Sequence, residues 1–197
     1  MSVLPRSSTP ARQASRPRGL KSLARRFARA TRGAAALEFA IIATPFFLFL
    51  FAVIEVGYMF FVSVMIDAGT LEAARKIRTG QMQFAGATAD DLWDDVCGNI
   101  SIVAPCEGRL FLDVRTYDDF ASTRAPLPIE EREFDPTGLH VDFGEEGDIV
   151  LVRSYYLWDV MFPDLGTGLA NLNGGKRLMT STIAFRNEPF GEIVVEE

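Results

Sequence analysis

Few side chains in this sequence have the types and spacing needed for catalysis or metal binding. A short acidic segment contains four aspartates (Asp90, Asp91, Asp94 and Asp95), and a second, EEGD, begins at Glu145. On a short helix the aspartates predict a solvated face, and EEGD lacks the regular spacing of oxygen ligands in a calcium-binding loop. His140, the single histidine, has no serine or cysteine partner in a recognisable catalytic arrangement. We therefore expect no catalytic residue, metal site or cofactor, and we do not expect an enzyme.

The two cysteines, Cys97 and Cys106, are even in number and close in sequence. In an oxidising compartment they predict a disulfide across the loop CGNISIVAPC, which would add a few kcal/mol of stability. Two free buried thiols are the alternative. A zinc site is disfavoured, because two thiolates and one distant histidine do not complete a tetrahedral ligand set.

Glu38 is a carboxylate inside a long apolar segment. From Gly33 to Ile66 the only charged residues are Glu38 and Glu55. The run 34–54 matches the roughly 20 apolar residues that a helix needs to cross a membrane core of about 30 Å. A carboxylate in hydrocarbon is costly unless it lies near an interface, is protonated or is paired. We therefore expect Glu38 and Glu55, about 25 Å apart along a helix, to lie near opposite bilayer surfaces.

Charge is distributed very unevenly along the chain. Residues 1–32 hold nine of the twenty Lys and Arg residues and no acidic residue, which leaves eleven basic against twenty-six acidic residues in the remainder. Basic residues before an apolar helix predict a cytoplasmic N-terminus, and the acidic remainder then lies across the membrane. A basic arm can also bind nucleic acid, but the apolar segment that follows favours membrane lipid as the partner and no nucleic acid. Residues 1–20, rich in Ser, Pro and Arg, are predicted to be disordered.

The helix is predicted to continue past the membrane, over about 34–79. Small and basic residues recur at helical spacing after Ile66, Glu72 and Lys76 are spaced to form an i,i+4 ion pair, and Gly80 is a plausible C-cap. Pro45 removes one backbone hydrogen bond and can kink the helix. A helix of this length exceeds any bilayer, so its distal part should stand in an extracytoplasmic domain.

The rest of the chain predicts a small antiparallel sheet, which makes the fold class α+β. Thr88 is a suitable N-cap for a short helix running to about Val96. Alternating apolar residues predict three strands, at 110–117, 149–157 and 179–185, with a weaker one at 140–143. The intervening segments 118–138 and 162–175 are predicted to be irregular.

The boundary of the apolar segment resembles the type IV pilin superfamily, whose precursors carry a basic leader ending in Gly and a Glu at the fifth mature position. Gly33 and Glu38 have this spacing. The wider stretch resembles the TadE-type pseudopilins of the tight-adherence (Flp) pilus system. The motif residues that carry this resemblance are Glu38-Phe39, Pro45 and Glu55-Val56-Gly57, with Arg186-Asn187-Glu188-Pro189 near the C-terminus.

The resemblance implies a minor pilin or pseudopilin that acts in biogenesis of a Tad-type pilus. It implies that a prepilin peptidase cuts between Gly33 and Ala34, and that Glu38 then attracts the new α-amino group of a neighbouring subunit. The expected regions are a cleaved cytoplasmic leader (1–33), a transmembrane and assembly helix (34–66) and a periplasmic domain (67–197), with the chain held in the bacterial inner membrane. Expected partners are the peptidase, other pilin-like subunits and the pilus assembly machinery. The alternatives are an unprocessed, membrane-anchored scaffold or binding protein and, less favoured, an anchored enzyme.

Overall fold

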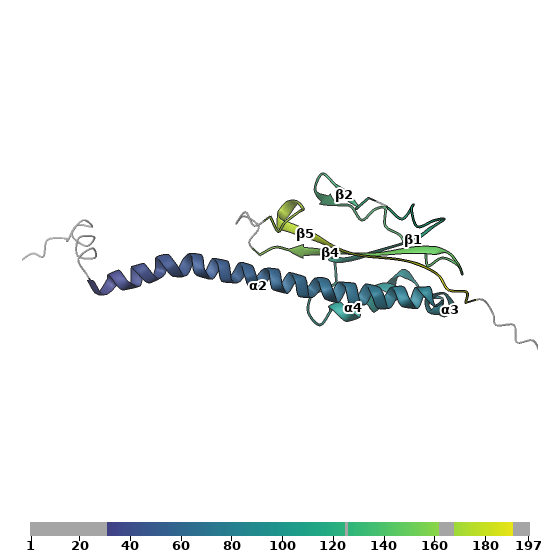
Figure 1. The fold of residues 1–197 in the computed structure, drawn as a ribbon, viewed down its shortest axis with the longest axis horizontal. Coiled ribbons are helices and arrows are strands. Elements are labelled where there is room, and N and C mark those ends of the chain that lie inside the picture. Colours follow the sequence, from purple (N-terminus) through teal and green to yellow (C-terminus); the bar gives the residue numbers. More distant parts are fainter. Residues whose placement is uncertain (1–30, 125, 162–167, 191–197) are drawn as a thin grey trace, which may run out of the picture. The chain divides into compact units, whose positions relative to one another are not determined.

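The computed structural model describes residues 31–124, 126–161 and 168–190 (Figure 1). The predicted disorder of residues 1–20 therefore lies outside the described residues. The chain divides into two compact units, residues 1–49 and residues 50–197. The elements in chain order are α2 (Thr31–Arg78), α3 (Gln81–Ala85), α4 (Ala89–Ile100), β1 (Leu110–Tyr117), β2 (Ile129–Glu130), β3 (Glu133–Phe134), β4 (Ile149–Asp159), the 3-10 helix η2 (Asn173–Gly175) and β5 (Lys176–Arg186).

Helix α2 confirms the long helix expected over 34–79 and ends where the sequence predicts. The Gly80 N–H donates to the carbonyl of Ile77 at 3.0 Å, and Gly80 has a φ of 77°. This left-handed conformation suits glycine, because a side chain would be strained there. Pro45 lies inside the helix, as expected.

The three predicted strands form one antiparallel sheet in the order β1-β4-β5. Leu110 pairs with Tyr156 and Ile149 pairs with Arg186, so β4 is the central strand. Its first eight residues are all buried, since both faces of the sheet are covered. Apolar and polar residues therefore alternate only weakly along β4. Both β4 and β5 extend beyond the ends predicted from the sequence.

One face of the sheet packs on the second part of α2, and the other lies beneath the β2–β3 hairpin (Figure 1). The residues that α2 contributes to the core are Met59, Val62, Ile66, Ala73, Ala74 and Ile77. On the opposite face, Phe134 of the hairpin lies 5.6 Å from the ring of Tyr155 and 4.9 Å from that of Phe111. The domain is thus a sheet between a long helix and a loop layer.

The structure corrects five sequence predictions. Helix α4 runs to Ile100 rather than to about Val96. The segment 118–138, predicted to be irregular, contains the β2–β3 hairpin. The hairpin was not predicted because its turn positions, which have positive φ, are occupied by Glu131 and Arg132 rather than by the usual Gly or Asn. The weak strand at 140–143 is a single parallel bridge between Val114 and Val141. The segment 162–175 contains η2, while residues 162–167 lie outside the described part.

The fifth correction concerns the ion pair predicted between Glu72 and Lys76. Glu72 instead pairs with Arg75 at 2.6 Å, and Lys76 pairs with Asp95 of α4 at 2.7 Å. The guanidinium of Arg75 binds the Glu72 carboxylate through two nitrogens, which a lysine does not do. The tertiary packing of α4 on α2 then supplies the partner of Lys76.

Candidate functional site

The first part of α2 exposes large apolar side chains on all its sides. Phe39 is 70% exposed, Ile42 69% and Phe49 71%. Among the described residues, this is the one helix long and apolar enough to cross a membrane, with a mean hydropathy of 2.4 in its most apolar window. A monomer in water rarely presents so much apolar surface, so this segment needs a lipid or protein environment.

The motif residues near the start of α2 lie on this exposed surface. Gly33 and Glu38 are both exposed, and Ala34 falls in the same first turns of the helix. The hydroxyl of Thr44 donates to the carbonyl of Ala40 at 2.9 Å, immediately before Pro45. Between Gly33 and Ile54 Glu38 is the one charged residue, and its exposed side chain is available to another molecule.

Glu55, the second carboxylate of the motif, is buried in the domain. Its side chain is only 2% exposed and accepts a hydrogen bond from the backbone N–H of Met161. One turn further on, the hydroxyl of Tyr58 donates to the carbonyl of Val103, and its ring lies 5.2 Å from that of Trp158. The expected position of Glu55 at a bilayer surface stays a prediction, but its partner is now identified as a backbone group of the domain. Gly57 faces open space.

Helix α4 is fixed to α2 through a close helix contact. A Cβ atom on Gly69 would lie 2.9 Å from the carbonyl oxygen of Val96, so α4 packs against a residue without a side chain. The predicted disulfide joins Cys97 at the end of α4 to Cys106 before β1, with 5.9 Å between their Cα atoms. The end of the helix is therefore bonded covalently to the start of the sheet.

The acidic cluster of α4 has structural roles. Asp91 and Thr88 form a capping box, in which the Asp91 carboxylate accepts from the Thr88 N–H at 2.7 Å. This backbone hydrogen bond, together with that of the Thr88 hydroxyl, lowers the pKa of Asp91. Asp95 binds Lys76. Within the part of the chain that the structure describes, no three His, Cys, Asp or Glu residues are grouped so as to hold a metal ion.

The C-terminal motif connects the end of β5 to the end of α2. Asn187 is 2% exposed, and its side-chain amide donates to the carbonyls of Phe143 and Glu145. The Glu188 N–H donates to the carbonyl of Arg78 at 2.9 Å, and their side chains form an ion pair at 3.3 Å. Arg186 and Pro189 are exposed. The buried part of this motif thus holds strand and helix ends together.

A buried ion cluster in the sheet was not apparent in the sequence. Asp113 of β1 is fully buried, and its carboxylate accepts from Arg153 of β4 at 2.7 Å and from Arg115 at 2.9 Å. The backbone N–H of His140 donates to the same carboxylate at 3.3 Å. The strand register places Asp113 directly opposite Arg153, and only this pairing could have identified them.

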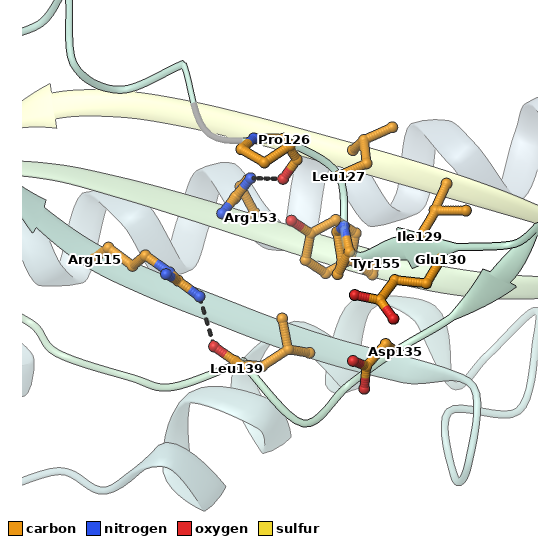
Figure 2. A pocket seen from close by; sticks show the side chains of 11 residues that line it. Arg115, Pro126, Leu127, Ile129, Glu130, Asp135, Leu139, Arg153 and Tyr155 are labelled. Carbon is orange, nitrogen blue, oxygen red and sulfur yellow. Dashed lines mark hydrogen bonds between the residues drawn. The ribbon is translucent and has the colours of Figure 1, made fainter.

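A pocket of about 380 Å³ lies over this cluster, with Arg115 and Arg153 on one side and Glu130 and Asp135 on the other (Figure 2). The arginines also donate to backbone carbonyls, Arg153 to Pro126 and Arg115 to Gly138. Two positive and two negative side chains leave the pocket without net charge.

Tyr155 forms the floor of this pocket. The residue is fully buried, and burial raises its pKa to about 12. Its hydroxyl has no hydrogen-bond partner among the residues that the structure describes. The guanidinium of Arg153 lies 5.7 Å from the ring centroid, within cation–π range.

Comparison with known protein families gives a match in the long helix α2. Residues 33–75 match the family model described as TadE-like protein. The match begins at Gly33, extends over Glu38, Pro45 and Glu55, and confirms the sequence resemblance in this part of the chain. No curated protein matched the chain, and no solved structure did so.

Proposed function

We propose that this TadE-like chain is a minor pilin or pseudopilin that takes part in biogenesis of a Tad-type (Flp) pilus. The observation that carries the proposal is the family match over residues 33–75. Within this segment α2 exposes apolar side chains on all its sides between Leu37 and Ile54. Such a surface suits a helix that lies first in lipid and then among the helices of other subunits.

In this proposal the chain is made as a precursor with a basic leader, residues 1–33. A prepilin peptidase cuts between Gly33 and Ala34 and so creates a new α-amino group close to the inner membrane surface. The apolar run over 34–54 anchors the subunit. The part of α2 from Glu55 onward packs on the sheet and belongs, with residues 67–197, to the periplasmic domain. The disulfide between Cys97 and Cys106 agrees with that oxidising compartment.

The proposed role of Glu38 is electrostatic. In an apolar environment a carboxylate is stabilised by an opposite charge nearby, and the α-amino group of a neighbouring subunit's Ala34 supplies one. Glu38 is exposed on its helix, so none of the described residues occupies the position of that partner. The pair would set the register between adjacent subunits.

N-terminal sequencing of the protein extracted from membranes tests the processing step. We expect a mature chain that begins at Ala34, and an intact Met1 or a cut elsewhere would exclude processing at this site. Substitution Glu38→Gln, with Glu72→Gln as the matched control on the same helix, tests the assembly step. We expect loss of pilus assembly with normal membrane insertion for the first variant and normal assembly for the second.

The second candidate is a permanently anchored scaffold or binding protein with the same topology. It is favoured by the large domain that follows the helix, since residues 50–197 form a compact unit of their own. In that case the leader stays attached and Glu38→Gln leaves pilus assembly unchanged. The two measurements above therefore distinguish the candidates.

A further inference from the structure

Strand β5 is one of the two outer strands of the sheet, and one of its edges has no partner strand among the described residues. The Asn187 N–H donates to the carbonyl of Asp148, at the start of β4, whereas the Leu178 N–H donates to the side chain of Asn171 on the opposite side. Backbone groups of alternate residues point to the same edge of a strand. The N–H and C=O groups of Thr180, Thr182 and Ala184 therefore point away from β4, and no hydrogen bond joins them to any of the described residues.

This free edge lacks the features that usually prevent strand addition. Edge strands are commonly protected by proline, lysine, a bulge or a covering loop. Between Thr180 and Ala184 the strand has none of these residues, and the register with β4 is continuous from Lys176 to Arg186. Among the described residues of the loop before β5, Leu169, Asn171 and Leu172 bond to the beginning of the strand, between Lys176 and Leu178.

Two hollows lie along the same edge, between β5 and α2. The first, of about 300 Å³, is lined by Met59 and Phe60 of the helix and by Met179 and Thr180 of the strand. The second, of about 410 Å³, is lined by Leu71 of the helix and by Ile183, Ala184 and Phe185 of the strand. Alternate side chains of an added strand would point toward the helix and into these hollows.

The arginines around the free edge of β5 give it a positive charge, although the domain as a whole is acidic. Arg177 lines the first hollow, Arg75 and Arg78 line the second, and Arg186 ends the strand. Arg75 and Arg78 pair with Glu72 and Glu188. Arg177 and Arg186 have no carboxylate partner within the described ranges. Against the net charge of −15 that residues 33–197 carry, this local excess of positive charge favours an acidic partner.

A second copy of the chain related by twofold symmetry does not suit this edge. The two hollows show that β5 runs in the same direction as α2, because Met59 lies beside Met179 and Leu71 lies beside Ile183. Two copies related by twofold symmetry would pair their β5 edges antiparallel. Their α2 helices would then point in opposite directions, which two subunits inserted with the same topology cannot adopt. This exclusion alone rests on the proposed membrane insertion.

We propose that the free edge of β5 binds an extended, acidic segment of a partner protein, which adds to the sheet as a fourth strand. Backbone hydrogen bonds to Thr180, Thr182 and Ala184 hold the segment. Its apolar side chains enter the two hollows against α2, and its carboxylates, on the opposite face, lie near Arg186. The edge of β5 is thus a peptide-binding site with specificity for alternating apolar and acidic residues.

Fluorescence anisotropy with the full-length protein in nanodiscs tests the proposal. The probe is a labelled synthetic peptide of alternating Val and Glu. Its matched control is the same peptide N-methylated on the alternate residues whose N–H groups would face β5, which keeps the charge and removes those hydrogen-bond donors. The protein variants are Thr182→Pro, Arg186→Glu and the control Arg124→Glu, an exposed arginine outside β5 and both hollows. Proline at 182 removes no N–H that β4 uses, and an edge strand tolerates it.

We expect the unmodified peptide to bind the wild-type protein and the Arg124→Glu variant equally. Binding should weaken by about tenfold or more for Thr182→Pro and for the N-methylated peptide, and by about threefold to tenfold for Arg186→Glu. If Thr182→Pro does not fold, as judged by its thermal midpoint, the comparison of the two peptides still decides the question.

Three results would overturn the proposal. The first is the absence of peptide binding, and the second is equal binding of the N-methylated peptide. The third is binding that appears only after deletion of residues 191–197, which would assign the edge to the chain's own C-terminal segment. None of these results bears on cleavage after Gly33, so the proposed function is tested separately.

Discussion

Substitution of Asp113 by asparagine gives the sharpest test of how the domain is held together. The Asp113 carboxylate is fully buried and balances Arg153, whose side chain is only 6% exposed, and Arg115, whose side chain is 32% exposed. Asparagine has almost the same volume but no charge. The substitution therefore leaves the shape of the core nearly unchanged and removes the counter-charge of a buried guanidinium.

The expected loss follows from the burial of the two arginines. Breaking a buried ion pair by removing one partner costs about 3–5 kcal/mol. Arg115 is partly solvated and contributes little to this cost, so the lower end, about 3 kcal/mol, is expected. For a domain of this size, each kcal/mol lowers the midpoint of thermal unfolding by about 2–4 °C, and the predicted decrease is about 6–12 °C.

Thermal unfolding of the full-length protein in detergent, followed by tryptophan fluorescence, measures this change. Trp158 is buried in the core near the sheet, so its emission reports loss of packing. Asp94→Asn is the matched control, because Asp94 is exposed on α4 and its substitution should change stability by less than about 0.5 kcal/mol.

A decrease in the Asp113→Asn midpoint no larger than that of the control would refute the reasoning. A second variant, Arg153→Met in the Asp113→Asn background, separates charge from packing. If the uncompensated guanidinium causes the loss, the double variant should regain part of the stability, and the coupling between the two sites should fall within about 0.5–3 kcal/mol.

Three further predictions follow from the described contacts. Replacing both Cys97 and Cys106 by serine should lower the free energy of unfolding by about 2–3 kcal/mol, the amount expected for a loop of this length; equal denaturation midpoints with and without reductant would contradict it. Tyr155→Phe removes a buried hydroxyl that lacks a hydrogen-bond partner in the described part of the chain, so the free energy of unfolding should stay the same or rise by up to about 1 kcal/mol. A chemical denaturation curve that shows a clear loss would reveal a hidden partner. The lowered pKa of Asp91 means that its capping of α4 stabilises the fold fully above the ordinary value of 3.8 and is lost as the pH falls below it, through the lower folded pKa. Asp91→Asn should therefore reduce the acid sensitivity of the helical circular dichroism signal, and an unchanged acid transition would exclude this role.

The sequence predicts the elements of this fold better than their tertiary partners. The long helix, the Thr88 cap and the three strands follow from local patterns of apolar residues and caps, which act within a few residues. The disulfide was predictable because only one pairing of two cysteines exists. The β2–β3 hairpin was not, because Glu131 and Arg132 adopt positive φ values without the usual turn residues.

The groups that hold the domain together were hidden because their partners are distant in sequence. Glu55 reads as a carboxylate near a membrane surface, and its bond to the Met161 N–H spans more than a hundred residues. Asp113 and Arg153 look like ordinary charges in amphipathic strands until the register places them opposite each other. Motif reasoning identified Asn187 as important, but only the structure shows that it bonds to the carbonyls of Phe143 and Glu145.

The strand order β1-β4-β5 determines when the domain is able to fold during synthesis. The central strand begins only at Ile149 and its outer neighbour at Lys176, and the hydroxyl of Thr70 on α2 bonds to Ser154 in that late strand at 2.7 Å. Until the ribosome has made these strands, the core-facing residues of α2, from Met59 to Ile77, have no sheet to cover them. In the proposed topology, folding is then a late event on the far side of the membrane, after nearly the whole chain has been translocated. A truncation before β5 would thus leave a chain that still enters the bilayer but exposes an uncovered stripe to chaperones and proteases of that compartment.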